Sequence, residues 1–256
     1  MTQRTRLTRA SPSRRQAGLS LVELMVAITI ALFILAGVSM VFVNMKKAFT
    51  SQDGLAQLQD TERFAMTALI DSIESAGYFA DPVTFTTASA LPADAGYAYG
   101  AFGAGQGIVG QAGATATTPD TISTRYQSSG SDGLMDCLGN TYAVSTLIYN
   151  TYGISGSNEL QCSVRSVNTV TGVATVIAAT PLVSGVSLLK VSYGVNTGVT
   201  ADSGSADSYV TAAAVTDWSA VRTARLSVDF VNPYAAEPGQ SAAVRWMQTV
   251  NLMNAR

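Results

Sequence analysis

A single apolar stretch near the start of the chain constrains its fold more than any other feature. From Leu24 to Val43, 17 of 20 residues are apolar, and the 22 residues between Glu23 and Lys46 carry no charge. A helix of that length rises about 33 Å, which is enough to cross the hydrocarbon layer of a membrane. The stretch therefore predicts a membrane-spanning helix.

The charges around this stretch predict its orientation. The first 18 residues contain no acid and five arginines, namely Arg4, Arg6, Arg9, Arg14 and Arg15. Basic flanks stay cytoplasmic, so we expect the rest of the chain to be exported. A cleaved secretory signal fits poorly, because the stretch is too long and no Ala-x-Ala site follows it. A plain signal anchor, carrying a periplasmic binding or enzyme domain, remains the alternative.

The composition excludes several classes of function. Without those five arginines the chain has 10 basic and 17 acidic residues, a net charge of −7, so we expect no direct nucleic-acid binding. There is no histidine and there are only two cysteines, which removes His-based catalysis and the common zinc sites. We predict no enzyme activity, no cofactor and no metal site. Asp202, Asp207 and Asp217 lack the spacing of a calcium loop, and Lys190 is expected to be an exposed strand residue.

Glu23 stands out because it lies at the start of the apolar run. A carboxylate at membrane depth is costly unless it is paired, so Glu23 is a functional candidate. Residues 14–27, RRQAGLSLVELMVA, resemble the class III signal of type IV prepilins and pseudopilins. The resemblance implies cleavage by a prepilin peptidase between Gly18 and Leu19, and N-methylation of Leu19. That family usually has Phe where this chain has Leu19.

Under this resemblance Glu23 is the fifth residue of the mature chain. Its carboxylate would neutralise the new α-amine at Leu19, on its own subunit or on a neighbour. An unpaired charge at low dielectric is heavily penalised, so this pair would favour the correct axial register during assembly.

Residues 44–77 predict a continuation of the same helix, with an apolar stripe at three- and four-residue steps and Gly77 as its stop. The stripe comprises Leu55, Leu58, Ala65, Met66, Leu69, Ile70 and Ile73. Asp53 and Gly54 interrupt the pattern and predict a bend or a locally melted turn. Residues 83–119, rich in Ala and Gly, predict a long loop or short irregular strands anchored by aromatic residues, namely Tyr97, Tyr99 and Phe102.

The rest of the chain predicts a β-rich domain, with residues 194–217 as a surface loop. The first predicted strand is Tyr142–Tyr149, followed by a turn at residues 150–153. A hairpin of Leu160–Val167 and Val170–Ala178 is predicted around Asn168 and Thr169. The remaining predicted strands are Ser187–Tyr193, a strand over 224–230, and Val244–Leu252, which closes the sheet. The predicted fold class is α+β, with a long N-terminal helical spine and a C-terminal β-rich head.

Three later motifs resemble the PilW-type minor pilins: residues 136–140, 218–228 and 249–254. Cys137 and Cys162 would lie in an oxidising compartment, where a disulfide is favoured over two buried thiols. The expected domains are a basic leader (1–18), the N-terminal helix (19–78) and a periplasmic or extracellular head (79–256).

The resemblance implies a minor pilin that joins a complex priming type IV pilus assembly and supports motility, adhesion or DNA uptake. The implied partners are prepilin peptidase, other minor pilins, the major pilin and the inner-membrane assembly platform. The implied location is the inner membrane before assembly and the pilus at the cell surface afterwards. A type II secretion pseudopilin is the alternative within the same family.

Overall fold

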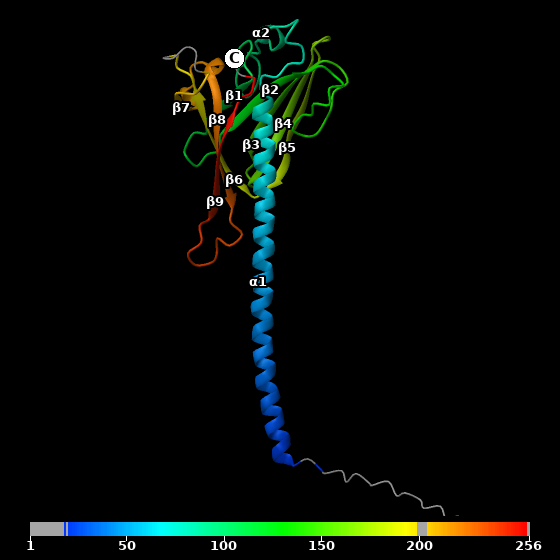
Figure 1. The fold of residues 1–256 in the computed structure, drawn as a ribbon, viewed down its shortest axis with the longest axis vertical. Helices are drawn as coiled ribbons and strands as arrows, with labels where there is room; N and C mark the ends of the chain where they lie inside the picture. Colours follow the sequence, from blue (N-terminus) through cyan, green and yellow to red (C-terminus); the bar gives the residue numbers. More distant parts are fainter. Residues whose placement is uncertain (1–17, 19, 199–203, 255–256) are drawn as a thin grey trace, which may run out of the picture. The chain divides into compact units, whose positions relative to one another are not determined.

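The computed structural model describes residues 18, 20–198 and 204–254. The chain divides into two compact units, residues 1–53 and residues 54–256. Helix α1 (Leu21–Ser75) contributes to both units, and the other elements belong to the second (Figure 1). These are α2 (Thr87–Ala90), β1 (Ile108–Gln111), β2 (Thr121–Ser128), β3 (Thr146–Ile154), β4 (Glu159–Asn168), β5 (Ala174–Ser184), β6 (Val186–Val195), β7 (Ser208–Thr211), β8 (Val221–Val231) and β9 (Ala243–Asn251).

The strands form two antiparallel sheets with the orders β1-β2-β3-β4-β5 and β7-β6-β8-β9. The C-terminal part of α1, from Ala65 to Ile73, packs against residues of both sheets. Ala65, Met66, Leu69 and Ile73 of the helix join one core cluster with buried residues of β2, β3, β4, β6 and β8. The predicted apolar stripe is therefore confirmed where it faces the sheets, whereas Leu55 is 47% exposed.

The first sheet is covered on both faces. On one face, Ser72 of α1 lies 2.6 Å from the hydroxyl of Thr124 in β2, and the Tyr152 hydroxyl of β3 donates to the Ala68 carbonyl at 3.1 Å. On the other face, a second core cluster joins β3 to the segment that precedes β1; it contains Leu91, Tyr97, Phe102, Val109, Leu147 and Tyr149. The expected aromatic anchoring of that segment by Tyr97 and Phe102 is confirmed, and Tyr99 packs partly buried beside them.

Two strand predictions were wrong because the first sheet is covered on both of its faces. Residues 150–153, predicted as a turn, lie inside β3, where Asn150, Thr151 and Tyr152 are buried and pair with β4. Strand β2 was not predicted, because its polar sequence TISTRYQS does not alternate. Its side chains find buried partners instead, as in the 2.7 Å contact between the hydroxyls of Ser123 and Thr151.

The second sheet follows the alternation predicted from its sequence. Leu189, Val191 and Tyr193 of β6 are buried, and β8 has the predicted half-buried pattern. Strand β9 closes this sheet beside β8, as expected for the C-terminal strand. The predicted hairpin is also present, although its turn is longer and β5 begins at Ala174.

Two further expectations are wrong in part. The surface loop at 194–217 contains the strand β7 and a 3-10 turn at Ala212–Ala214; residues 199–203 lie outside the described residues. Helix α1 is continuous through Asp53 and Gly54, so the locally melted turn predicted there is absent. A side chain at Gly54 would collide with the ring of Tyr234 from the β8–β9 connection, so the glycine here provides space for a close contact.

Candidate functional site

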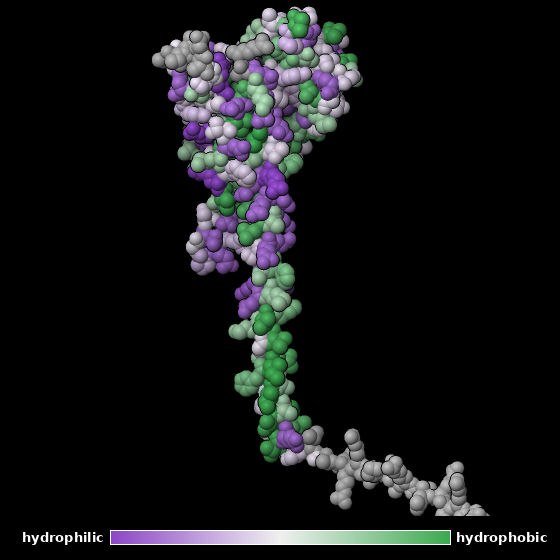
Figure 2. Space-filling model, in the orientation of Figure 1, coloured by the Kyte–Doolittle hydropathy of each residue, from purple (hydrophilic) through white to green (hydrophobic). Residues whose placement is uncertain are grey.

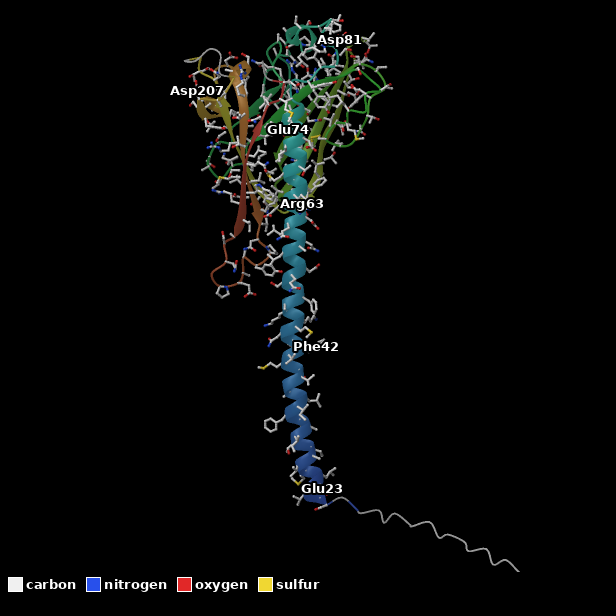
Figure 3. All side chains as sticks on the ribbon, viewed as in Figure 1. Glu23, Phe42, Arg63, Glu74, Asp81 and Asp207 are labelled. Carbon is white, nitrogen blue, oxygen red and sulfur yellow. A yellow bond between two sulfur atoms is a disulfide. The ribbon has the colours of Figure 1, made fainter. Side chains whose placement is uncertain are left out.

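The candidate site is the beginning of α1. Gly18 is described and exposed, whereas its predicted cleavage partner Leu19 lies outside the described residues. The amide of Leu24 donates to the carbonyl of Ser20 at 3.1 Å, which closes the first turn of the helix. Glu23 lies in that turn (Figure 3). The N-terminal end of a helix carries a partial positive charge, so a carboxylate is stabilised in the first turn.

The apolar side chains that follow Glu23 are exposed over their whole run. Leu24 is 50% exposed, Phe33 81% and Phe42 67%, and Figure 2 shows the hydrophobic colour along this part of α1. This segment is also the one described helix that is long and apolar enough to cross a membrane. A surface of this kind is stable in lipid or against other apolar helices, and not in water.

The polar residues within the run are compatible with an apolar environment. The Thr29 hydroxyl donates to the carbonyl of Val26 at 2.8 Å, and the Ser39 hydroxyl donates to the carbonyl of Leu35 at 2.7 Å. Each hydroxyl donor is thus satisfied inside the helix, which is the usual arrangement for such residues in membrane helices. Glu23 is the one charged group of the described residues 20–45.

The C-terminal end of α1 is held by Asn254. The Asn254 side-chain amide donates to the carbonyls of Glu74 and Ala76, both at 3.3 Å, so it satisfies carbonyls that the end of a helix leaves open. Gly77 follows with φ +81°, and its amide donates to the Arg125 carbonyl at 2.9 Å. Gly77 is thus the helix stop that the sequence predicted, and Asn254 is the residue of the 249–254 motif that contacts this end of the helix.

The motif at residues 136–140 forms a closed turn held by Asp136. Its carboxylate accepts the amides of Leu138 at 2.8 Å and Asn140 at 3.0 Å, and the Tyr142 hydroxyl donates to it at 2.7 Å. Gly139 adopts φ +82°, a conformation that favours glycine.

The predicted disulfide joins this turn to the first sheet. Cys137 is bonded to Cys162 of β4, with their Cα atoms 6.4 Å apart. Because Cys162 is fully buried in the main core cluster, the bridge connects a surface turn to the centre of the domain.

The motif that begins at Trp218 packs against the second sheet. The Trp218 ring meets the Tyr193 ring edge-on at 4.7 Å. Asp217 precedes it and accepts the Ser219 amide at 2.8 Å, and the hydrogen bonds from Ser219 lower the pKa of this carboxyl. The acid thus caps a 3-10 turn at Trp218–Ala220.

Of the other two acids named from the sequence, the one that the structure describes has a comparable role. Asp207 accepts the Thr197 hydroxyl at 2.8 Å, and Asp202 lies outside the described residues. Lys190 is not simply an exposed strand residue. Its ammonium group contacts the buried Asp120 at 2.6 Å and the carbonyl of Thr118 at 2.9 Å, and so fixes the loop before β2.

The most buried charge among the described residues was not predicted from the sequence. Arg125 in β2 is fully buried and donates to four carbonyls of the segment before β1, those of Leu91, Pro92, Gly103 and Gln106, at 2.6–3.2 Å. Its guanidinium also lies 4.6 Å from the centre of the Phe102 ring. Burial lowers the pKa of Arg125. A lone arginine in a polar strand gives no sequence signal of this role, because its acceptors are backbone atoms.

Comparison with known families gives two matches. Residues 13–39 match the prokaryotic N-terminal methylation motif, and residues 141–247 match the family described as Type IV Pilus-assembly protein W. No curated protein and no solved structure gives a significant match. The first match contains Gly18, Leu19 and Glu23, and the second contains the Trp218 motif but not the turn at 136–140.

These matches confirm the resemblance to type IV pilin-like proteins, most closely to the PilW type. The α+β fold, with its long apolar helix and β-rich C-terminal region, agrees with it. The N-terminal motif and the apolar helix fit a membrane-anchored protein, and the matched family is one of pilus-assembly proteins rather than enzymes.

Proposed function

We propose that this chain is a minor pilin that joins a minor-pilin complex priming type IV pilus assembly. The observation that carries the proposal is the combination of Glu23 in the first helical turn with the exposed apolar run that follows it. The run serves as a membrane anchor before assembly and as part of the filament core afterwards. The assembled pilus then supports motility, adhesion or DNA uptake.

In this proposal residues 1–18 are a leader, residues 19–78 the assembly helix and residues 79–256 the exported head. Prepilin peptidase cleaves between Gly18 and Leu19, and the new terminus at Leu19 is methylated. The partners are other minor pilins, the major pilin and the inner-membrane assembly platform. The chain moves from the inner membrane to the pilus at the cell surface.

The mechanism is non-covalent and depends on charge pairing at low dielectric. Cleavage creates an α-amine at Leu19 four residues before Glu23. In a bundle of apolar helices this amine and the Glu23 carboxylate have few other polar partners, so a subunit that is displaced along the bundle axis leaves both charges unpaired. The pair thereby favours one axial register.

Replacement of Glu23 tests this mechanism. Glu23→Gln keeps the shape of the side chain and removes its charge, and Asp53→Asn makes the same change in an exposed acid of α1 that follows the apolar run. The amount of this chain in sheared pili and the number of pili per cell are measured. We expect Glu23→Gln to reduce both strongly and Asp53→Asn to leave both near the wild-type level. Normal piliation with Glu23→Gln would contradict the mechanism.

The match to a pilus-assembly family favours this function over a type II secretion pseudopilin. Genetic complementation separates the two. Deletion of the gene should remove pili and leave protein secretion intact, and the reverse result would assign the chain to a secretion system.

A further inference from the structure

Two adjoining clefts lie on the face of the first sheet that is turned away from α1. Their volumes are about 250 and 360 Å³, and Tyr99, Ser163 and Ala179 line both of them. One ordered water takes about 30 Å³, so each cleft has room for a small organic molecule. Because Tyr99 belongs to the walls of both, its side chain lies where the two clefts meet.

Small residues keep these clefts open. In β5 a bulge places Ala178 and Ala179 opposite the single residue Ser163 of β4, and Gly153 of β3 lines the smaller cleft. Bulges are common beside functional sites, where they re-aim a side chain or interrupt strand pairing. A larger side chain at Ala179 would occupy space in both clefts, so the hollow depends on the small residues at these positions.

The floor of the clefts presents polar groups that the protein itself does not satisfy. Ser163 is only 7% exposed, and its hydroxyl makes no hydrogen bond within the described part of the chain. It pairs in register with Thr151, whose hydroxyl is by contrast occupied by those of Ser123 and Tyr97. Thr121, which lines the smaller cleft, also has a buried hydroxyl without a partner among the described residues. Leaving such a group unpaired is costly, so a ligand group that bonds to Ser163 is favoured.

The charged groups beside the clefts are already paired. Arg165 of the larger cleft bonds to Asp94, and Asp120 of the smaller cleft bonds to Lys190 at 2.6 Å. Among the described residues no other charged side chain lines either cleft. A charged ligand would therefore find no free counter-charge here, and a wholly apolar ligand would leave the hydroxyl of Ser163 without a partner. The lining favours a ligand that is neutral and polar.

The backbone at the floor is not available to a peptide. The floor belongs to β3 and β4, which are inner strands of the sheet and pair with a neighbour on each side. An extended peptide is held by main-chain hydrogen bonds at an open sheet edge, which this floor does not offer. A sugar ring needs no such edge, because its hydroxyls bond to side chains and its C–H face packs on an aromatic ring such as that of Tyr99.

We infer that the two clefts form a binding site for a neutral sugar ring, with Tyr99 against its C–H face and with Ser163 and Gln161 bonded to its hydroxyls. Gln161 lines the smaller cleft, is half-buried, and has no side-chain partner within the described part of the chain. All of these residues belong to the head, so the inference does not rest on the proposed function. The site would give the head a ligand besides the subunits with which the chain assembles.

Saturation-transfer NMR on the purified full chain tests this inference. The chain is held in phosphocholine micelles, which contain no sugar, and is titrated with the neutral methyl glycosides of glucose, galactose, mannose and N-acetylglucosamine. We expect at least one of them to receive saturation, with a Kd in the millimolar range, beyond what micelles alone transfer. N-acetylneuraminic acid, a sugar with a carboxylate, should bind at least about tenfold more weakly than that glycoside, because the clefts offer no free cation.

Two variants locate the binding. Ala179→Leu occupies both clefts and should abolish saturation transfer, whereas Ala174→Leu makes the same change at an exposed position of β5 that lines neither cleft and should preserve it. Ser163→Ala should raise the Kd about tenfold. It should leave the Tm unchanged, because the hydroxyl that it removes has no partner in the described part of the protein.

Four results would overturn the inference: no glycoside receives saturation, the charged sugar binds as well as the neutral ones, binding persists in Ala179→Leu, or Ser163→Ala binds as tightly as the wild type. Near-UV circular dichroism of each variant reports whether it is folded. If Ala179→Leu does not fold, Ser163→Ala keeps the test decisive. The N-terminus of the same protein is analysed in parallel. A processed terminus without sugar binding contradicts only this site, while an unprocessed terminus contradicts the proposed function.

Discussion

The two compact units of this chain use apolar residues in opposite ways. In residues 21–49 the large apolar side chains are exposed, and the hydroxyls of Thr29 and Ser39 bond within the helix. In residues 54–256 the apolar side chains form a closed core, and buried polar groups such as Arg125 and Asp120 bond to distant segments. The first unit therefore needs an apolar environment from outside, while the second supplies its own. Substitutions in the two units should have separable effects.

The largest effect is expected from Arg125→Leu, which leaves four backbone carbonyls without their donors. We expect the free energy of unfolding of the head to fall by about 4 kcal/mol or more, since each buried group left unpaired costs about 1–3 kcal/mol. Denaturant unfolding of the full chain in detergent, followed by near-UV circular dichroism, measures this change. Arg63→Leu removes an exposed arginine of α1 and serves as the control. A loss below about 1 kcal/mol for Arg125→Leu would show that the segment before β1 is held by other contacts.

The disulfide should contribute slightly less. Replacement of both Cys137 and Cys162 by alanine opens a loop of 26 residues, counted inclusively from a separation of 25, and should destabilise the head by about 3.5 kcal/mol. The same assay measures the loss. Reduction of the wild type should reproduce it, whereas the double variant should not respond to reductant. Membrane insertion of the double variant should equal that of the wild type.

A matched pair of leucines in α1, one in each unit, tests the contrast between the exposed apolar run and the closed core directly. Leu69 is fully buried and Leu32 is 61% exposed. Leu69→Ala should destabilise the head by about 3 kcal/mol, because it removes core contacts and leaves a cavity. Leu32→Ala should change the unfolding of the head by less than about 0.5 kcal/mol. Similar losses for the two variants would contradict the division into two units.

The smallest effect is expected at Asp217. Asp217→Ala removes a cap on Ser219 and should cost about 1 kcal/mol at neutral pH. The pKa of this carboxyl is lower in the folded state. Its stabilising effect is therefore present above its unfolded pKa of about 3.9, and is lost as the pH falls through the folded value. Melting temperatures of wild type and variant should converge as the pH falls through the folded pKa of Asp217, and a constant difference across pH would refute this explanation.

The sequence predicted the helix and the second sheet because each obeys one simple period. The apolar run is recognised by its length, the stripe through Met66 and Leu69 follows the helical repeat, and β6 and β8 alternate because only one of their faces is buried. Strands β2 and β3 lie between two covering layers, so residues on both faces are buried and alternation disappears. Arg125 was missed for a related reason, since its four acceptors are carbonyls of a segment that has no periodic pattern.

The candidate site was predictable as a set of residues but not as a geometry. Gly18, Leu19 and Glu23 are defined by their spacing, and the structure adds that Glu23 lies in the first turn of α1. The disulfide was predictable because it depends on the compartment and on having only two cysteines.

The most direct test of the proposed function is the N-terminus of the membrane-extracted protein. Its intact mass and N-terminal sequence are determined from cells with and without prepilin peptidase. We predict that the chain begins at Leu19, one methyl group heavier, only where the peptidase is present. A chain that retains its leader in both samples would contradict processing at Gly18, and would identify the apolar helix as a plain signal anchor.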